Sequence, residues 1–285
     1  MAVKSDWLLV NGYRLTAWRP LSILSILTAF LLFFSNCQEP TEDCLDVRAT
    51  NFNVAAGKAC VSCCTYPSLT LKMNYLSDTS SFVFNSTYTN SIGQKFRVLG
   101  AQMYLSDFQL FTSDGKAYAP TDSVSLYRQT DTVKTLNNYA LVGRNNGFDF
   151  TVGAFGDAIG KTFTKVKFQI GLSDTANLTD PKKMPPSSPL STKADSMYLT
   201  PAKTYIFNKL IVAKGVGFKD TLRLNIATAQ TVQVAGSIPT VEGINAVIKL
   251  KINYLRLFDG VNFTDGETVI KGKIVANYGT TFSIQ

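Results

Sequence analysis

The chain has 285 residues, with 28 Lys and Arg against 20 Asp and Glu, and it contains no histidine. The absence of histidine excludes Ser–His–Asp and Cys–His catalysis and histidine-ligated metal sites from this chain. The positive charges are scattered singly and form no basic stripe, so we expect no nucleic-acid partner.

The N-terminal residues have the features of a lipoprotein signal peptide. A basic leader precedes an apolar run over residues 21–34, and Cys37 follows. The run is shorter than the roughly 20 residues of a transmembrane helix and has the size of a secretory signal core. We expect residues 1–36 to be cleaved and Cys37 to be lipidated; an uncleaved signal anchor is the alternative. Either arrangement predicts an extracytoplasmic chain, and the first predicts an outer-membrane lipoprotein on the periplasmic or cell-surface face.

A short acidic tether over residues 37–43 leads to a cysteine-rich module over residues 44–67. This module holds four of the five cysteines of the chain: Cys44, Cys60, Cys63 and Cys64. Outside the cytoplasm such a cluster predicts disulfides, with a four-thiolate zinc site as the alternative. Because Cys63 and Cys64 are neighbours, each is expected to pair with Cys44 or Cys60.

The module also resembles a short extracellular motif of the form C-x-D-x-x-A-x-N-[FY]-N…C-x-Y, matched from Cys44 to Tyr66. In that motif the first cysteine pairs with the cysteine that precedes x-Tyr. The resemblance therefore implies a Cys44–Cys64 disulfide, which leaves Cys60 and Cys63 for a second one.

Residues 68–285 are expected to form mainly strands. Seven segments alternate apolar with polar residues or are rich in β-branched and aromatic residues: 68–76, 95–112, 162–172, 204–213, 220–229, 245–258 and 268–276. The only expected helical turn lies near residues 153–160, and the long proline-containing stretch over 173–200 is typical of a functional or disordered loop. Strands do not alternate with helices, so the sequence predicts an all-β antiparallel β-sandwich preceded by the small disulfide-stapled module.

Five segments of this region, in the same order, resemble the MbnP-like family of secreted β-sandwich proteins. They are the hairpin at 103–116, the stretch at 166–181, the segment at 197–210, the late strand at 247–263 and the closing residues 276–282. The resemblance covers most of the chain from Ser68 onward and implies the sandwich fold for a domain over 68–285.

The resemblance also implies copper as a cofactor, bound in the family through histidines and an oxidatively modified tryptophan. After residue 37 this sequence has neither residue type. The positions that correspond to family histidines and tryptophans hold Tyr198, Leu199, Pro201 and Asn225. The fold inference is unaffected by these replacements, but the copper inference loses its ligands.

Only oxygen and sulfur ligands remain for a metal. Asp174, Asn177 and Asp180 lie within seven residues of one loop and are the best candidate for a hard cation such as calcium. Copper(I) prefers thiolate or thioether sulfur, but we expect disulfides at the cysteines and core positions for the methionines. No spacing brings two carboxylates together, so no catalytic residue is assigned and we expect no enzyme.

Two classes of function remain. The family resemblance favours a lipid-anchored, non-catalytic, extracytoplasmic binding protein, with its copper role in doubt because histidine and tryptophan are missing. The alternative is a surface-exposed interaction module that uses loops such as 173–200 to bind a small ligand, a glycan or a surface protein. The membrane is a partner through the lipid anchor in both.

Overall fold

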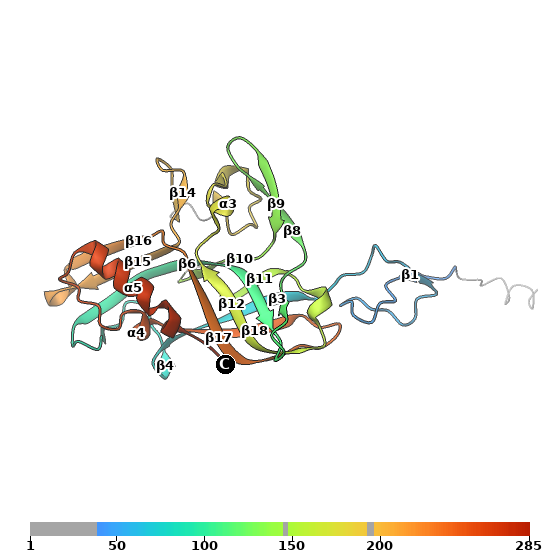
Figure 1. Ribbon diagram of the computed structural model, residues 1–285, viewed down its shortest axis with the longest axis horizontal. Coiled ribbons are helices and arrows are strands. Elements are labelled where there is room, and N and C mark those ends of the chain that lie inside the picture. The colour runs from blue at the N-terminus through green and yellow to red at the C-terminus, as the bar shows by residue number, and fades with distance from the viewer. Residues whose placement is uncertain (1–38, 145–147, 193–196) are drawn as a thin grey trace, which may run out of the picture.

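The computed structural model describes residues 39–144, 148–192 and 197–285 (Figure 1). The expected signal peptide and Cys37 lie outside these residues. Within them, no helix has the length and apolar composition needed to cross a membrane.

The larger of two main sheets has eight strands and is built around one long strand, β6 (Lys95–Phe111). Its strand order is β16-β15-β6-β12-β17, and every pair is antiparallel. The bounds along this path are β16 (Asp220–Ile226), β15 (Asn208–Lys214), β12 (Thr162–Ile170) and β17 (Gln230–Pro239). Three further strands pair with β6, namely β5 (Tyr88–Thr89), β7 (Ala117–Tyr118) and β10 (Tyr139–Gly143).

The second main sheet has five strands, in the order β11-β3-β18-β19 with β4 paired to β3. The bounds are β11 (Asp149–Ala154), β3 (Ser68–Ser77), β18 (Ala246–Asn253), β19 (Phe282–Ile284) and β4 (Ser80–Ser81). All its pairs are antiparallel except β3 with β18, which run parallel with Leu71 opposite Ile248. The expected all-β fold is therefore confirmed, and the antiparallel pattern has this one exception in the main sheets.

The core lies between the two sheets because each strand buries every second residue. In β3 the buried residues are Leu69, Leu71 and Met73, and in β18 they are Ile248, Leu250 and Ile252. The facing residues of the larger sheet include Val166, Phe168 and Ile170 of β12, which belong to the same apolar cluster. This two-layer arrangement is the β-sandwich that the alternation predicts.

Two helices follow the last long strand, where the sequence analysis placed strands. The predicted strand 245–258 ends at Asn253, whose side chain accepts hydrogen bonds from the backbone N–H of Leu255 and Arg256 and so caps α4 (Tyr254–Leu257).

The prediction of a strand at 268–276 is wrong, because these residues belong to the helix α5 (Glu267–Thr281). Its buried residues Ile270, Ile274, Tyr278 and Thr281 recur at helical spacing, which outweighs the β-branched composition. Burial on one face of the helix thus overrides local propensity.

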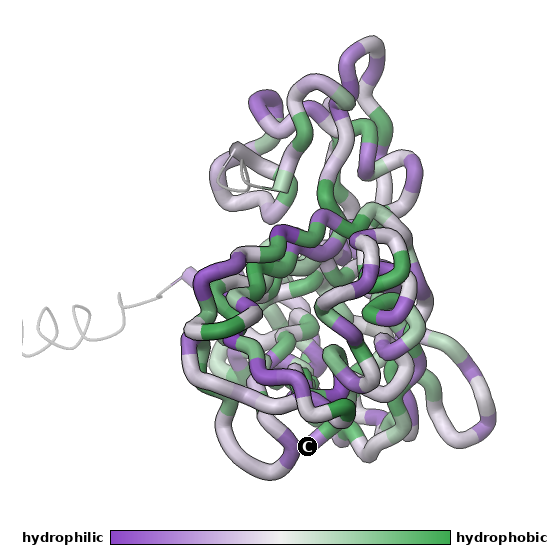
Figure 2. Tube along the Cα trace, turned by 90° about the vertical axis from the view of Figure 1, so that its left-hand side faces the viewer, coloured by the Kyte–Doolittle hydropathy of each residue, from purple (hydrophilic) through white to green (hydrophobic). Residues whose placement is uncertain are grey.

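A smaller lobe stands on the sandwich (Figures 1 and 2). We use "lobe" for residues 123–136, 173–192 and 197–205. It contains the hairpin of β8 (Ser123–Tyr127) and β9 (Thr132–Leu136), the short helices α3 (Asp174–Asn177) and η2 (Pro181–Lys183), and the hairpin of β13 (Tyr198–Leu199) and β14 (Thr204–Tyr205). An apolar cluster of its own, which includes Leu126, Met184, Leu190, Met197 and Tyr205, fills it. The expected loop 173–200 therefore contains ordered elements that belong to a packed unit.

The cysteine-rich module precedes β3 and has one short parallel pair, β1 (Glu42–Asp43) with β2 (Lys58–Ala59). The Cys44–Cys64 disulfide is formed, with an S–S distance of 2.01 Å. The expected second disulfide is wrong for this structure, in which Cys60 and Cys63 are free thiols. The tight turn at residues 60–63 directs the Cys63 thiol at the Cys60 carbonyl oxygen, 3.0 Å away, so the two sulfurs are not joined.

Candidate functional site

Three of the positions that correspond to family copper ligands lie in the β13–β14 hairpin of the lobe. Tyr198 and Leu199 form β13, and Pro201 lies in the turn that follows. The Tyr198 ring packs edge-on against Tyr205 at 5.0 Å, and Tyr205 packs against Tyr104 at 5.5 Å. Burial raises the pKa of Tyr198 and of Tyr205, so both remain neutral phenols at physiological pH. Tyr198 thus supplies packing, whereas Leu199 and Pro201 are exposed, and none of the three offers an imidazole to hold a metal.

The fourth position, Asn225, lies in a different environment. It belongs to β16, opposite Lys209 of β15, and lines a cavity of about 480 Å³ between β16 and α5. Thr268 and Lys271 of α5 line the same cavity. Neither an amide, a hydroxyl nor an ammonium group is a preferred copper ligand, so this cavity does not restore the missing site.

Two of the three residues predicted to bind calcium accept hydrogen bonds from backbone N–H groups. The Asn177 side-chain oxygen accepts a hydrogen bond of 2.7 Å from the backbone N–H of Tyr205, and the Asp180 carboxylate accepts one of 3.0 Å from Lys182 N–H. Asp174 is exposed in the first turn of α3. Within the described residues, moreover, no three or more His, Cys, Asp or Glu side chains gather where they could hold a metal ion. Asn177 therefore links α3 to β14, Asp180 caps η2, and Asp174 lies on the surface.

The isolated acids of the sequence also have separate local partners. Asp107 lies at a bulge of β6 with φ of 54°, and burial raises its pKa, opposed by a hydrogen bond from Asn138. The Asp114 carboxylate accepts a hydrogen bond from Thr112 in a turn. Four methionines, Met73, Met103, Met184 and Met197, are buried as expected. Thioether sulfur is thus used for packing.

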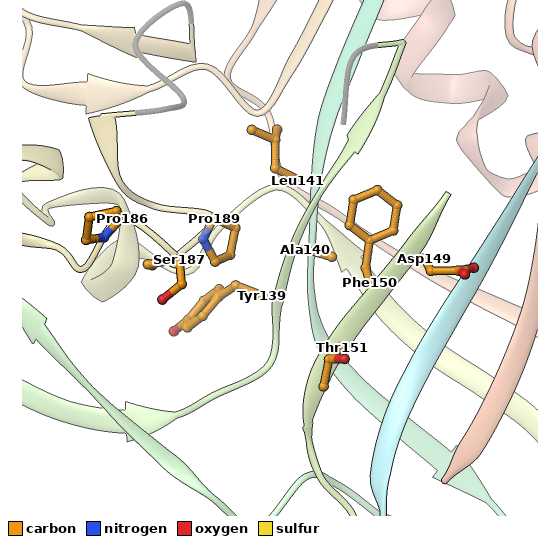
Figure 3. A pocket seen from close by; sticks show the side chains of 10 residues that line it. Tyr139, Ala140, Leu141, Asp149, Phe150, Thr151, Pro186, Ser187 and Pro189 are labelled. Atoms are coloured by element: carbon orange, nitrogen blue, oxygen red, sulfur yellow. The ribbon is translucent and has the colours of Figure 1, made fainter. Parts of the chain in front are cut away.

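The groove between the lobe and the sandwich is the candidate binding site (Figure 3). Its volume is about 380 Å³, and its lining residues are Tyr139, Ala140, Leu141, Asp149, Phe150, Thr151, Pro186, Ser187, Ser188 and Pro189. Figure 3 shows Pro186, Ser187 and Pro189 on one side and Phe150 and Thr151 on the other, while the Asp149 side chain points away. The groove thus presents two aromatic rings, proline rings and hydroxyl groups to one space.

The groove forms where the chain crosses from one sheet to the other. β10 is paired to β6 in the larger sheet, and β11, next in sequence, is paired to β3 in the smaller one. Residues 139–141 and 149–151 therefore meet at a sandwich edge that the lobe segment 186–189 covers. Surface loops that are placed on a rigid sheet scaffold are common positions for binding residues.

Two buried tyrosines hold that lobe segment in place. The Tyr205 hydroxyl donates a 2.6 Å hydrogen bond to the Leu190 carbonyl oxygen, and the Tyr104 hydroxyl donates a 3.2 Å hydrogen bond to that of Pro189. Both tyrosines are fully buried. Burial keeps their pKa values well above the ordinary value for tyrosine, so both hydroxyl protons are retained. The sequence indicated a functional or disordered loop over 173–200, which includes one wall of the groove, but missed residues 139–141 and 149–151, whose short strands carry a weak pattern.

The free thiols of the module form a second polar feature. The backbone N–H of Cys63 lies 3.1 Å from Cys60 Sγ, and the Ser62 hydroxyl lies 3.6 Å from the same sulfur. A hydrogen bond between the two thiols lowers the pKa of Cys60 and raises that of Cys63 to about 11. Cys60 is half-buried and Cys63 is exposed, so solvent reaches the pair.

Comparison with known proteins gives one family and one solved structure. The MbnP family model matches residues 66–274. The structure of MbnP from Methylosinus trichosporium is similar, with 14% sequence identity and a TM-score of 0.41, over 66% of this chain and 76% of that chain. No curated protein has a significantly similar sequence.

Proposed function

Because the chain belongs to the MbnP family, which supports an extracytoplasmic binding-type protein, we propose that it is a lipid-anchored, non-catalytic binding protein whose ligand site is the groove between lobe and sandwich. The sandwich then serves as a scaffold without the family's histidine and tryptophan copper site. Cys37 provides the lipid anchor in this proposal, on the outer membrane.

The groove carries the proposal. Its volume of about 380 Å³ lies in the range of about 300–1,000 Å³ that is usual for small-ligand pockets. Its walls combine the Phe150 ring and Pro189 with the hydroxyls of Thr151 and Ser187. Apolar walls with a few hydroxyl groups suit a small neutral polar molecule, with a mono- or disaccharide as the ligand class. One ring face can stack on a sugar while the hydroxyls exchange hydrogen bonds.

The absence of catalysis is supported by the distribution of titratable groups. Histidine is missing from the whole sequence, and the acids Asp107, Asp114 and Asp180 each have a separate local partner. A hydrolytic site for sugars would need two carboxylates that face a common substrate. The groove lining has one acid, Asp149, and its side chain points away.

The test is saturation-transfer NMR of the full chain in mild detergent with a mixture of neutral mono- and disaccharides, followed by calorimetry on any sugar that responds. The Phe150→Leu variant keeps an apolar side chain but removes the ring, and Ser187→Ala removes one exposed hydroxyl. Both should weaken binding, whereas Val216→Ala, an exposed residue outside the groove lining, should not. Binding that is unchanged by both groove variants, or no response to any sugar, would contradict the groove proposal.

The second candidate function is recognition of a surface protein by the lobe. Its support is the exposed tip of the β8–β9 hairpin and of residues 199–203, which project from the body (Figure 1). Capture of a partner that is lost when the β8–β9 tip is replaced, but kept in Phe150→Leu, would favour it over the groove.

A further inference from the structure

We propose that Cys60 and Cys63 form a copper(I) site on the cysteine-rich module. This inference concerns residues outside the match to the family model, which covers residues 66–274, and it does not depend on the groove. It assigns to the module a soft-metal site that the sandwich lacks.

The geometry of the turn brings two sulfur ligands together at the surface. Cys60 and Cys63 are separated by two residues, and the Cys63 backbone N–H lies 3.1 Å from Cys60 Sγ. Neither thiol is tied in a disulfide, while the neighbouring Cys44–Cys64 bond fixes the segment on which they lie. Because the disulfide closes the loop, the turn is held without using either of the two thiols.

The surroundings of the thiols favour a small cation. The backbone N–H of Cys60 donates a 2.9 Å hydrogen bond to the Asp43 carbonyl oxygen, which holds β1 beside the turn. The carboxylates of Glu42 and Asp43 lie close enough to act electrostatically on Cys60 and Cys63 respectively. Glu42 is paired with Lys58 at 3.2 Å, so the charge that attracts a cation comes from the two thiolates and the Asp43 carboxylate.

Copper(I) fits this pair better than zinc does. Thiolate sulfur is the ligand that selects copper(I), and copper(I) is satisfied by as few as two sulfurs. A structural zinc site takes four ligands, and no cluster of three His, Cys, Asp or Glu able to hold a metal occurs in the described part of the chain. A pair of thiolates without a third ligand therefore favours copper(I) over zinc.

The binding step balances without a change of oxidation state. One copper(I) ion joins the two sulfurs, both thiol protons leave to solvent, and the metal-bound pair carries a net charge of −1. Copper supplied as copper(I) needs neither an oxidant nor a reductant in this step. The Cys44–Cys64 disulfide takes no part.

The test is competition between the full chain, in mild detergent without oxygen, and the copper(I) chelator bicinchoninate. A mild reductant is used first, and mass spectrometry checks that Cys44–Cys64 stays closed. We expect one copper(I) per chain, with two thiols titratable before loading and none after. Cys60→Ser should weaken retention by at least about 100-fold, because the loss of even an outer partner of a metal ligand costs about 10- to 100-fold. The matched control, Val61→Ala, changes an exposed apolar residue between the cysteines and should retain copper(I) as the parent chain does.

Three results would overturn the inference. They are copper(I) retention unchanged in Cys60→Ser and in Cys63→Ser, a preference of the chain for zinc over copper(I), and failure of the mild reductant to release two titratable thiols. The last result would identify a Cys60–Cys63 disulfide as the stable state. Because all variants change exposed or half-buried positions of the module, sugar binding in the groove should be unaffected, so the two proposals fail separately.

Discussion

Removing the Tyr205 hydroxyl should loosen the lobe segment that forms one wall of the groove. In Tyr205→Phe the fully buried Leu190 carbonyl loses the 2.6 Å hydrogen bond that it accepts from that hydroxyl. Leaving a buried acceptor unsatisfied costs about 1–3 kcal/mol. Since about 1.4 kcal/mol is a factor of ten, local opening of residues 186–191 should become about 5- to 140-fold more frequent.

Hydrogen–deuterium exchange of residues 187–191 measures this opening directly. The matched control is Tyr278→Phe, which removes another fully buried hydroxyl, one bonded to the Asn208 side chain at 2.8 Å beneath α5. Exchange at 187–191 should rise in Tyr205→Phe and stay at the parent rate in Tyr278→Phe. Equal exchange rates in the parent and in Tyr205→Phe would refute the role assigned to this hydrogen bond.

Three further predictions concern the helix, the core and the module. Gly272→Ala should raise stability by roughly 0.5–1 kcal/mol in thermal unfolding, because the position is exposed within α5 and an added Cβ meets nothing within 4 Å; a loss of stability would argue against the helix. Phe96→Ala should destabilise the fold by about 3–5 kcal/mol in denaturant unfolding, since the ring is fully buried; a loss below about 1 kcal/mol would refute this core position. The Arg48 side chain lowers the pKa of Asp46, helped by the Tyr66 hydroxyl, so the stabilisation is present above the unfolded pKa of about 3.9 and is lost as the pH falls through the lower folded value. Proteolysis of the module should accelerate on acidification below about pH 4, and Asp46→Asn should be susceptible already at neutral pH; a variant as resistant as the parent would contradict the ion pair's role.

Much of the fold could be predicted because apolar and polar residues alternate along the main strands, as expected where one face of a strand is buried. The alternation of β3 and β6 predicted strands whose bounds agree closely with the structure. The disulfide partner of Cys44 was implied by the module's resemblance to an extracellular motif. The failure at α5 has a clear cause. Val269, Ile270, Ile274 and Val275 are β-branched and suggest a strand, whereas the burial of Ile270, Ile274 and Tyr278 on one face selects the helix.

The candidate groove was only half predictable. The prolines around Pro186 indicated a functional or disordered loop, but the opposite wall of the groove comes from β10 and β11, which lie in different sheets. The proximity of β10 and β11 depends on how the two sheets pack against each other, and a local sequence pattern does not predict that packing. The calcium site stays a prediction: Asn177 and Asp180 accept hydrogen bonds from backbone N–H groups, a role that their spacing alone does not separate from metal binding.

The central claim is that this MbnP sandwich is a binding scaffold without the family's copper site. The most direct measurement is competition between the Cys60→Ser/Cys63→Ser chain and a copper(II) chelator, with metal content read by mass spectrometry. With the module thiols removed, we predict no copper above background, because Tyr198 and Asn225 stand in different environments and offer no imidazole. One copper(II) held per chain by this double variant would contradict the account and place a metal site in the sandwich or its lobe.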